Sequence, residues 1–255
     1  MQPDDGRMRR LLNLMRPHQA VGQKKIRLGA PGDGGYVLLD DFAGIVRGVG
    51  CGVGWDVSFE RDLAERGIEI DLFDHTVAGP PTQHARFHFH RIRLGDGAGE
   101  DPCVSLDGIA AMYRLAPGTA ILKVDIEGDE WALLNQVTPA SLLRYRQIVI
   151  ELHWLNRAGD PQFLAAMTAA MRKLTRDFAV VHVHGNNNAP IASFGALKVP
   201  YVLELSLVSR HHYRLRRSHE EFPTALDAPN SDKRPDLPLG RFDFPRRLTD
   251  FLPRR

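Results

Sequence analysis

Residues 121–131 read Ile-Leu-Lys-Val-Asp-Ile-Glu-Gly-Asp-Glu-Trp, an apolar run that ends in carboxylates. The apolar part predicts a buried strand, Gly128 predicts a turn, and residues 129–137 have a helical pattern. Carboxylates at the carboxyl end of a buried parallel strand are costly unless they are paired or used in chemistry. Ligands bind at that end of the strands in open α/β sheets. The stretch therefore predicts an α/β fold with a functional site beside Asp125 and Glu127.

Outward from this stretch, strand-like and helix-like patterns alternate over residues 26–210, which predicts one α/β domain with three layers (α/β/α) and a mostly parallel sheet. The last two expected strands, 178–183 and 201–208, have no helical pattern between them, so we expect them to pair antiparallel. Residues 1–25 predict an N-terminal helical segment. Residues 211–255 predict an irregular, Pro- and Arg-rich tail that packs on the domain.

The composition excludes several classes of protein. The chain has 255 residues, 43% of them hydrophobic, and a net charge of +2, so neither a nucleic-acid partner nor an anionic membrane surface is expected. The two cysteines favour a reducing compartment, and the first residues lack a signal-peptide pattern. We expect a cytoplasmic protein without a membrane span that acts on a small molecule or a glycan. The oligomeric state stays open.

A glycine-rich loop, Gly48-Val49-Gly50-Cys51-Gly52-Val53-Gly54, follows one expected strand, and Asp74 ends the next. This arrangement favours an adenosine-type cofactor held by Gly48, Gly50, Cys51 and Gly52, with the acid on the ribose hydroxyls. The alternative is a tight turn with a solvated aspartate. The loop alone does not separate a nicotinamide cofactor from S-adenosylmethionine. However, Trp55 stands where a dinucleotide fingerprint has its third glycine.

The stretch Val124-Asp125-Ile126-Glu127-Gly128-Asp129-Glu130 resembles the Asp-[Ile/Val]-Glu-Gly-x-Glu signature of FkbM-type class I S-adenosylmethionine-dependent methyltransferases. Further blocks over residues 26–208 resemble that family in the same order, among them 32–36, 48–54, 72–74, 105–107, 151–153 and 182–187. The resemblance implies a Rossmann-like class I methyltransferase fold, whose seven-stranded sheet has an antiparallel last strand. It also implies methyl transfer to a hydroxyl of a sugar, glycan or related natural product.

By this resemblance, Gly50, Gly52, Asp74 and Asp96 lie along the cofactor. The chain departs from the family pattern where Cys51 and the residues after it replace an acidic residue. We therefore expect Asp33, or the backbone of Gly34 and Gly35, to contact the methionine moiety.

The polar residues at the ends of the later strands are the candidate reacting groups. We expect Asp125 to bind the acceptor, act as base or ligate a metal, with a structural pair to Lys123 as the alternative. His153 is the candidate base, because the pKa of histidine lies near working pH. Glu127 is assigned to catalysis or to helix capping, and Glu130 to structural support. We expect His184, Asn186 and Asn187 to contact the substrate. The alternative is that this segment forms a polar turn.

Two other functions remain open at this point. Asp125, Glu151, His153 and His184 could together ligate Mg²⁺ or Mn²⁺, which would serve either a methyltransferase or a metal-dependent hydrolase. A non-catalytic binding module on the same fold is the third hypothesis. The leading hypothesis is an S-adenosylmethionine-dependent O-methyltransferase.

Overall fold

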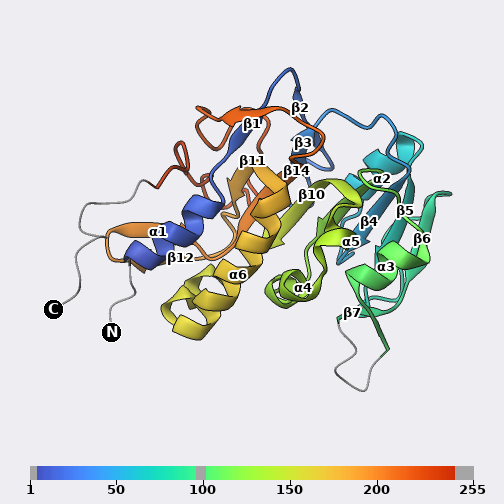
Figure 1. Cartoon of the computed structure of the whole chain (residues 1–255), viewed down its shortest axis with the longest axis horizontal. Helices are drawn as coiled ribbons and strands as arrows, with labels where there is room; N and C mark the ends of the chain where they lie inside the picture. The colour runs from blue at the N-terminus through green and yellow to red at the C-terminus, as the bar shows by residue number, and fades with distance from the viewer. Residues whose placement is uncertain (1–4, 96–101, 245–255) are drawn as a thin grey trace.

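The structure, a computed structural model, describes residues 5–95 and 102–244. Within these residues a seven-stranded sheet crosses the centre of the molecule (Figure 1). From one edge to the other its strands are β11 (Phe178–Gly185), β14 (Leu203–Ser209), β10 (Tyr145–Leu152), β9 (Ala120–Val124), β4 (Arg47–Cys51), β5 (Glu69–Phe73) and β6 (Phe87–His90). The sheet is mostly parallel, and β14 pairs antiparallel with both β10 and β11.

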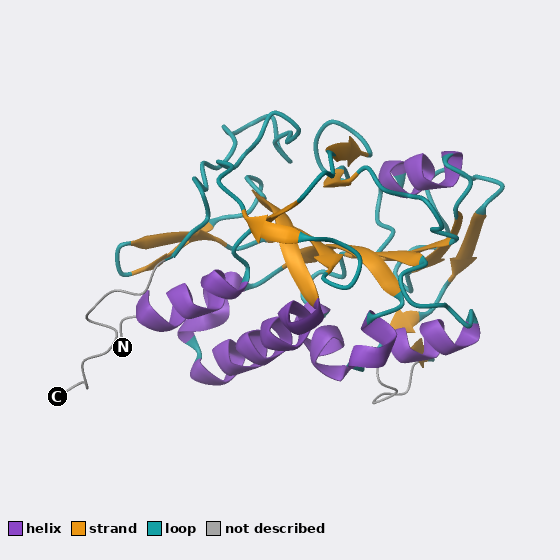
Figure 2. Cartoon of the chain, turned by 45° about the horizontal axis from the view of Figure 1, so that its top comes forward, coloured by secondary structure: helices purple, strands orange, loops and turns teal. Residues whose placement is uncertain are grey.

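One face of the sheet is covered by helices, which lie side by side in Figure 2. Their apolar faces form one core cluster with the sheet, through Met8, Ile109, Trp131 and Met167 among others. These helices are α1 (Asp5–Leu14), α3 (Leu106–Met112), α4 (Glu130–Gln136), α5 (Pro139–Leu142) and α6 (Pro161–Asp177). In α6, Asp160 caps the first turn by accepting from the Gln162 amide, and the buried Leu164, Met167, Met171 and Leu174 follow at helical spacing.

The other face differs from the expected helical layer. Helix α2 (Ser58–Glu65) is the one described helix that packs there, and strands and loops cover the remainder (Figure 2). The covering strands are β2 (Lys25–Leu28), paired with β3 (Tyr36–Leu39), and β1 (His18–Ala20), paired with β15 (Leu215–Arg217). The second α layer of the predicted α/β/α arrangement is thus reduced to one helix beside these strands.

The remaining short elements lie between the main ones. A hairpin of β12 (Ile191–Phe194) and β13 (Leu197–Pro200) connects β11 to β14, and β7 (Arg93–Leu94) pairs with β8 (Cys103–Val104). The 3₁₀ helix η1 (Leu155–Gly159) follows β10. Residues 218–244 have little regular structure and pack against β11 and β14, for example through Asp227 and Asn230. No helix in the described part of the chain has the length and apolarity that crossing a membrane requires.

Candidate functional site

A cleft of about 770 Å³ opens at the carboxyl ends of β4, β5, β9 and β10, where the sequence predicted a site. It brings together nine of the predicted site residues: Asp33, Gly34, Gly52, Asp74, Asp125, Glu127, Glu151, His153 and Asn186. Asp96 lies outside the described residues.

Gly52 joins the loop after β4 to the turn after β9. Its φ is +84°, and a Cβ atom there would lie 1.6 Å from the carbonyl oxygen of Asp125. The Asp125 amide donates to the Cys51 carbonyl at 2.9 Å, so the two segments touch through their backbones. Only glycine allows this approach.

Asp74 ties the same loop to the loop after β5. One of its carboxylate oxygens accepts from the Val53 amide at 2.8 Å, and the other accepts from the amide and hydroxyl of Thr76, both at 2.7 Å. Burial raises the pKa of Asp74, but these hydrogen bonds outweigh burial and lower it. The cleft therefore holds an ionised carboxylate at the end of β5.

Gly48, Gly50 and Cys51, which were predicted to hold the cofactor, do not line the cleft. Gly48 and Gly50 lie within β4, beneath α2, where a Cβ on Gly50 would lie 3.0 Å from a Glu60 carboxylate oxygen. Cys51 is buried in the core. A Cβ on Gly48 would lie 2.7 Å from the side chain of Ile70 in β5, so both glycines leave room for neighbouring side chains. The cleft contact therefore begins at Gly52.

Glu130 organises the turn after β9. Its side chain is 0% exposed, and its Oε1 atom accepts from the Ile126 amide at 3.0 Å and the Gly128 amide at 3.1 Å. Within this turn Glu127 has φ of +56°, and its side chain is 88% exposed in the cleft. Glu130 thus has the structural role that the sequence analysis assigned to it.

The same Glu130 oxygen also holds His153. It lies 3.0 Å from His153 Nδ1, while His153 Nε2 lies 3.4 Å from a Glu127 oxygen and 4.0 Å from a Glu151 oxygen. Burial lowers the pKa of His153, but the hydrogen bond and charge of Glu130, with the charges of Asp125 and Glu127, outweigh burial and raise it. This carboxylate–imidazole pair, with its second nitrogen towards the cleft, can accept a proton from a ligand.

Asp125 lies at the junction of these parts. Its carboxylate is partly buried, 3.8 Å from the ammonium group of Lys123 and 3.5 Å from the hydroxyl of Tyr36. Sequence reasoning did not include Lys123 among the site residues. A signal was present, because a lysine in an apolar strand, two residues before Asp125, points to the same face of the sheet.

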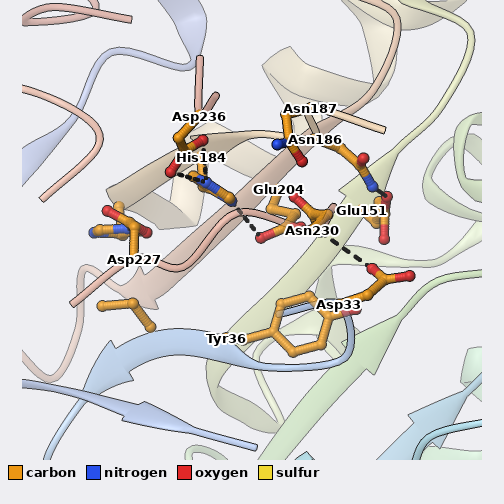
Figure 3. A network of polar contacts seen from close by, with 12 residues as sticks. Asp33, Tyr36, Glu151, His184, Asn186, Asn187, Glu204, Asp227, Asn230 and Asp236 are labelled. Carbon is orange, nitrogen blue, oxygen red and sulfur yellow. Dashed lines mark hydrogen bonds and ion pairs between the residues drawn. The ribbon is translucent and has the colours of Figure 1, made fainter. Parts of the chain in front are cut away.

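Glu151 is the most buried of the described acids that line the cleft. It is 5% exposed, and the Asn186 side-chain amide donates to it at 2.8 Å. Burial, followed by the charges of Asp125, Glu204 and Asp33, raises the pKa of Glu151 well above its usual range. Asp33 accepts from the Asn230 side chain at 3.1 Å, so residues 218–244 contact this lining residue of the cleft (Figure 3).

A Glu151→Gln substitution should therefore stabilise the fold at pH values above the pKa of a free carboxyl group. A group whose pKa is raised by folding contributes stability below its unfolded pKa, and that stability is lost as the pH rises towards the folded pKa. Glutamine keeps the oxygen that accepts from Asn186 and carries no charge. We expect the free energy of unfolding in urea to be about 1–3 kcal/mol larger for the variant at pH 8. The two proteins should converge near pH 4. A variant that is less stable at pH 8 would contradict this account of Glu151.

The structure keeps His184 and Asn187, which were predicted to contact the substrate, away from the cleft, because residues 218–244 bind both side chains. Figure 3 shows the contact of His184 with Asp236. His184 Nδ1 lies 3.1 Å from Glu204, and its Nε2 lies 3.0 Å from Asp236. Asn187 donates to the Ser231 and Arg234 carbonyls at 2.8 and 2.9 Å. Neither residue lines the cleft. Of the three predicted substrate residues, Asn186 alone does.

His184 should make the attachment of this segment depend on pH. Burial lowers the pKa of His184, but the hydrogen bond and charge of Glu204 and the charge of Asp236 raise it to about 9. This stabilisation is complete below about 6.5, the usual histidine pKa, and is lost as the pH rises through about 9. The free energy of unfolding lost in His184→Gln should thus be larger at pH 6 than at pH 10, as urea titrations at both pH values would measure. A loss that is equal at the two pH values would exclude this role.

The predicted metal set of Asp125, Glu151, His153 and His184 is not assembled. Two groups of ligand atoms within 4.8 Å of one another occur among the described residues: Asp125, Glu130 and His153, and separately Asp33, Glu151 and Glu204. In the first group, a Glu130 oxygen and a His153 nitrogen already share a hydrogen bond. His184 belongs to neither group. The four residues on which the metal-dependent hydrolase hypothesis depends therefore do not form one group of ligands among the described residues.

Comparison of the sequence with known proteins gives no family assignment: no family model matches it, and no match is found among curated proteins. The residues of the cleft are therefore the basis for inferring a function.

Proposed function

We propose that the chain is an S-adenosylmethionine-dependent methyltransferase that methylates a hydroxyl group of a sugar, glycan or related natural product. One observation carries the proposal. A glycine loop that contacts the carboxylate turn, the ionised Asp74 and the Glu130–His153 pair all meet in one cleft. The antiparallel strand β14 between β10 and β11 agrees with the sheet that the methyltransferase resemblance implies.

The charge of the cleft favours this cofactor over a dinucleotide. Among the described residues, the lysine and arginine residues that line the cleft are Arg93 and Lys123, whereas the lining acids are Asp33, Asp56, Asp74, Asp125, Glu127, Asp129 and Glu151. This excess of acids suits a sulfonium cation and repels a pyrophosphate. A pyrophosphate would also need free amides at a helix N-terminus. At the start of α2, the Ser58 amide instead donates to Asp56 at 2.5 Å.

The residues of the cleft divide between cofactor and acceptor. Asp74 would accept hydrogen bonds from the ribose hydroxyls, and Gly52 would let the cofactor approach the backbone. S-adenosylmethionine, when bound, supplies an electrophilic methyl group. Asp125, Glu127 and Asn186 would orient the acceptor hydroxyl, because carboxylate and amide groups at the cleft wall can hydrogen-bond it.

His153 would remove the proton of the acceptor hydroxyl. Its Nε2 atom accepts the proton, while Glu130 on Nδ1 fixes the tautomer and stabilises the imidazolium that forms. The acids nearest Nε2 are Glu127 and Glu151, and the charge of Glu127 also stabilises the imidazolium. This assigns Glu127 to the acceptor side of the reaction.

Calorimetric titration of the folded protein with S-adenosylmethionine and S-adenosylhomocysteine tests the proposal. We expect both to bind with one site per chain, and NAD⁺ not to compete. The Asp74→Asn variant should bind both more weakly, by about tenfold, because an amide cannot replace the ionised acceptor of two hydroxyls. If folded protein binds neither ligand at millimolar concentration, the proposal is refuted.

A further inference from the structure

Lys123 is a buried cation in the middle of the apolar strand β9. It is 6% exposed, and its strand neighbours in register are Gly50 of β4 and Val149 of β10. A lysine is rarely buried unless its charge is paired. The groups around its ammonium therefore indicate why it is there.

Three groups surround the Lys123 ammonium group, one through a hydrogen bond and two through longer ion pairs. It donates to the Gly52 carbonyl at 2.6 Å, and it lies 3.8 Å from both a Glu60 oxygen and an Asp125 oxygen. Gly52 belongs to the loop after β4, and Asp125 begins the turn after β9. A single cation thus joins the two segments that meet in the cleft.

The acids around Lys123 favour its positively charged ammonium form. Burial lowers the pKa of Lys123, but the charges of Glu60, Asp125 and Glu151 outweigh burial and raise it. Glu60 is a residue of α2, its side chain occupies the space that Gly50 leaves free, and burial raises the pKa of Glu60. Lys123 also lines the cleft itself, so its charge acts on whatever binds there.

Resting on the methyltransferase function above, we propose that Lys123 is a positioning residue for methyl transfer. Its ammonium group holds the Gly52 carbonyl and the Asp125 carboxylate in place and puts one positive charge beside the reacting atoms. Two consequences follow. Loss of Lys123 releases the loop and the carboxylate together. It also leaves the cleft more negative, which favours a cationic ligand over a neutral one.

The matched ligands S-adenosylmethionine and S-adenosylhomocysteine separate these effects, because they differ by the charged methylsulfonium. In Lys123→Met, both should bind more weakly. The ratio of their affinities should nevertheless shift by about fivefold in favour of S-adenosylmethionine, since one nearby positive charge is gone. In Asp125→Asn the ratio should shift by about fivefold in the opposite direction. Calorimetry of each variant measures both constants.

Lys173→Met is the matched control, because Lys173 also donates to backbone carbonyls, those of Asn135 and Val137, and does not line the cleft. It should lower stability and leave the affinity ratio unchanged. If Lys123→Met does not fold, the double variant Glu60→Gln/Lys123→Met is used in its place, because it also removes the buried acid that Lys123→Met leaves unpaired.

The outcomes are distinct. Opposite shifts of the ratio in the Lys123 and Asp125 variants support the proposal. A ratio that stays constant in a folded Lys123 variant, or in Asp125→Asn, overturns it and leaves Lys123 a structural ion. Failure of the wild-type protein to bind either ligand refutes the methyltransferase function instead.

Discussion

Gly52→Ala is expected to lower the free energy of unfolding by more than about 3 kcal/mol and to abolish cofactor binding. The added methyl group would lie 1.6 Å from the Asp125 carbonyl oxygen, and the backbone φ of +84° disfavours any residue with a Cβ. To relieve the clash, the loop after β4 must separate from the turn after β9. The separation breaks two hydrogen bonds: one from the Asp125 amide to the Cys51 carbonyl, and one from the Lys123 ammonium group to the Gly52 carbonyl.

Gly54→Ala is the matched control for this effect. Its φ of +54° is also positive, but a Cβ there would meet nothing within 4 Å. We expect it to cost about 1 kcal/mol, the penalty of the left-handed conformation alone. Thermal unfolding followed by circular dichroism would show the difference as a melting temperature roughly 5 °C or more lower for Gly52→Ala. Equal melting temperatures for the two variants would show that the contact of Gly52 with Asp125 is unimportant.

His153→Asn is expected to reduce kcat by about 10²–10⁴-fold and to leave the affinity for S-adenosylmethionine nearly unchanged. Asparagine can still donate to Glu130 from the position of Nδ1, so the buried acid keeps its partner, but it has no basic nitrogen. His182→Asn is the control, because His182 is bonded to Asp227 at 2.7 Å and does not line the cleft. The rate is followed as release of S-adenosylhomocysteine with a panel of sugars and glycans.

The rate of this reaction should also depend on pH in a defined direction. A base must be neutral, so the rate should rise with pH up to the pKa of His153, which lies above the usual 6.5. Glu130→Gln removes the charge that raises this pKa, so the rising limb should move to lower pH. An unaltered rate in folded His153→Asn would assign the base to another residue.

The position of the site could be predicted from the sequence because it depends on local patterns. The apolar run before Asp125 and the run 147–152 before His153 predict adjacent parallel strands, and side chains at their ends must meet at one edge of the sheet. The order of strands and helices over residues 26–210 likewise predicts a mostly parallel sheet, which the structure has.

The predicted site residues that lie outside the cleft are those whose surroundings depend on packing between segments distant in the sequence. Gly50 and Gly52 look alike in the sequence, but α2 covers the first and the turn after β9 touches the second. His184 and Asn187 look available for a ligand, yet Asp236 and Ser231, more than 40 residues later, occupy them. No periodic pattern in residues 211–255 predicts where that segment packs. Similarly, nothing local predicts that strands β2 and β3 replace a helix on the second face.

A crystal structure of the complex with S-adenosylhomocysteine is the most direct test of the proposed cleft. The account predicts that the ribose hydroxyls bind Asp74, that the backbone at Gly52 contacts the ligand, and that the sulfur atom faces Asp125 and His153. A nucleoside bound elsewhere on the protein, or in this cleft with its sulfur directed away from both residues, would contradict it.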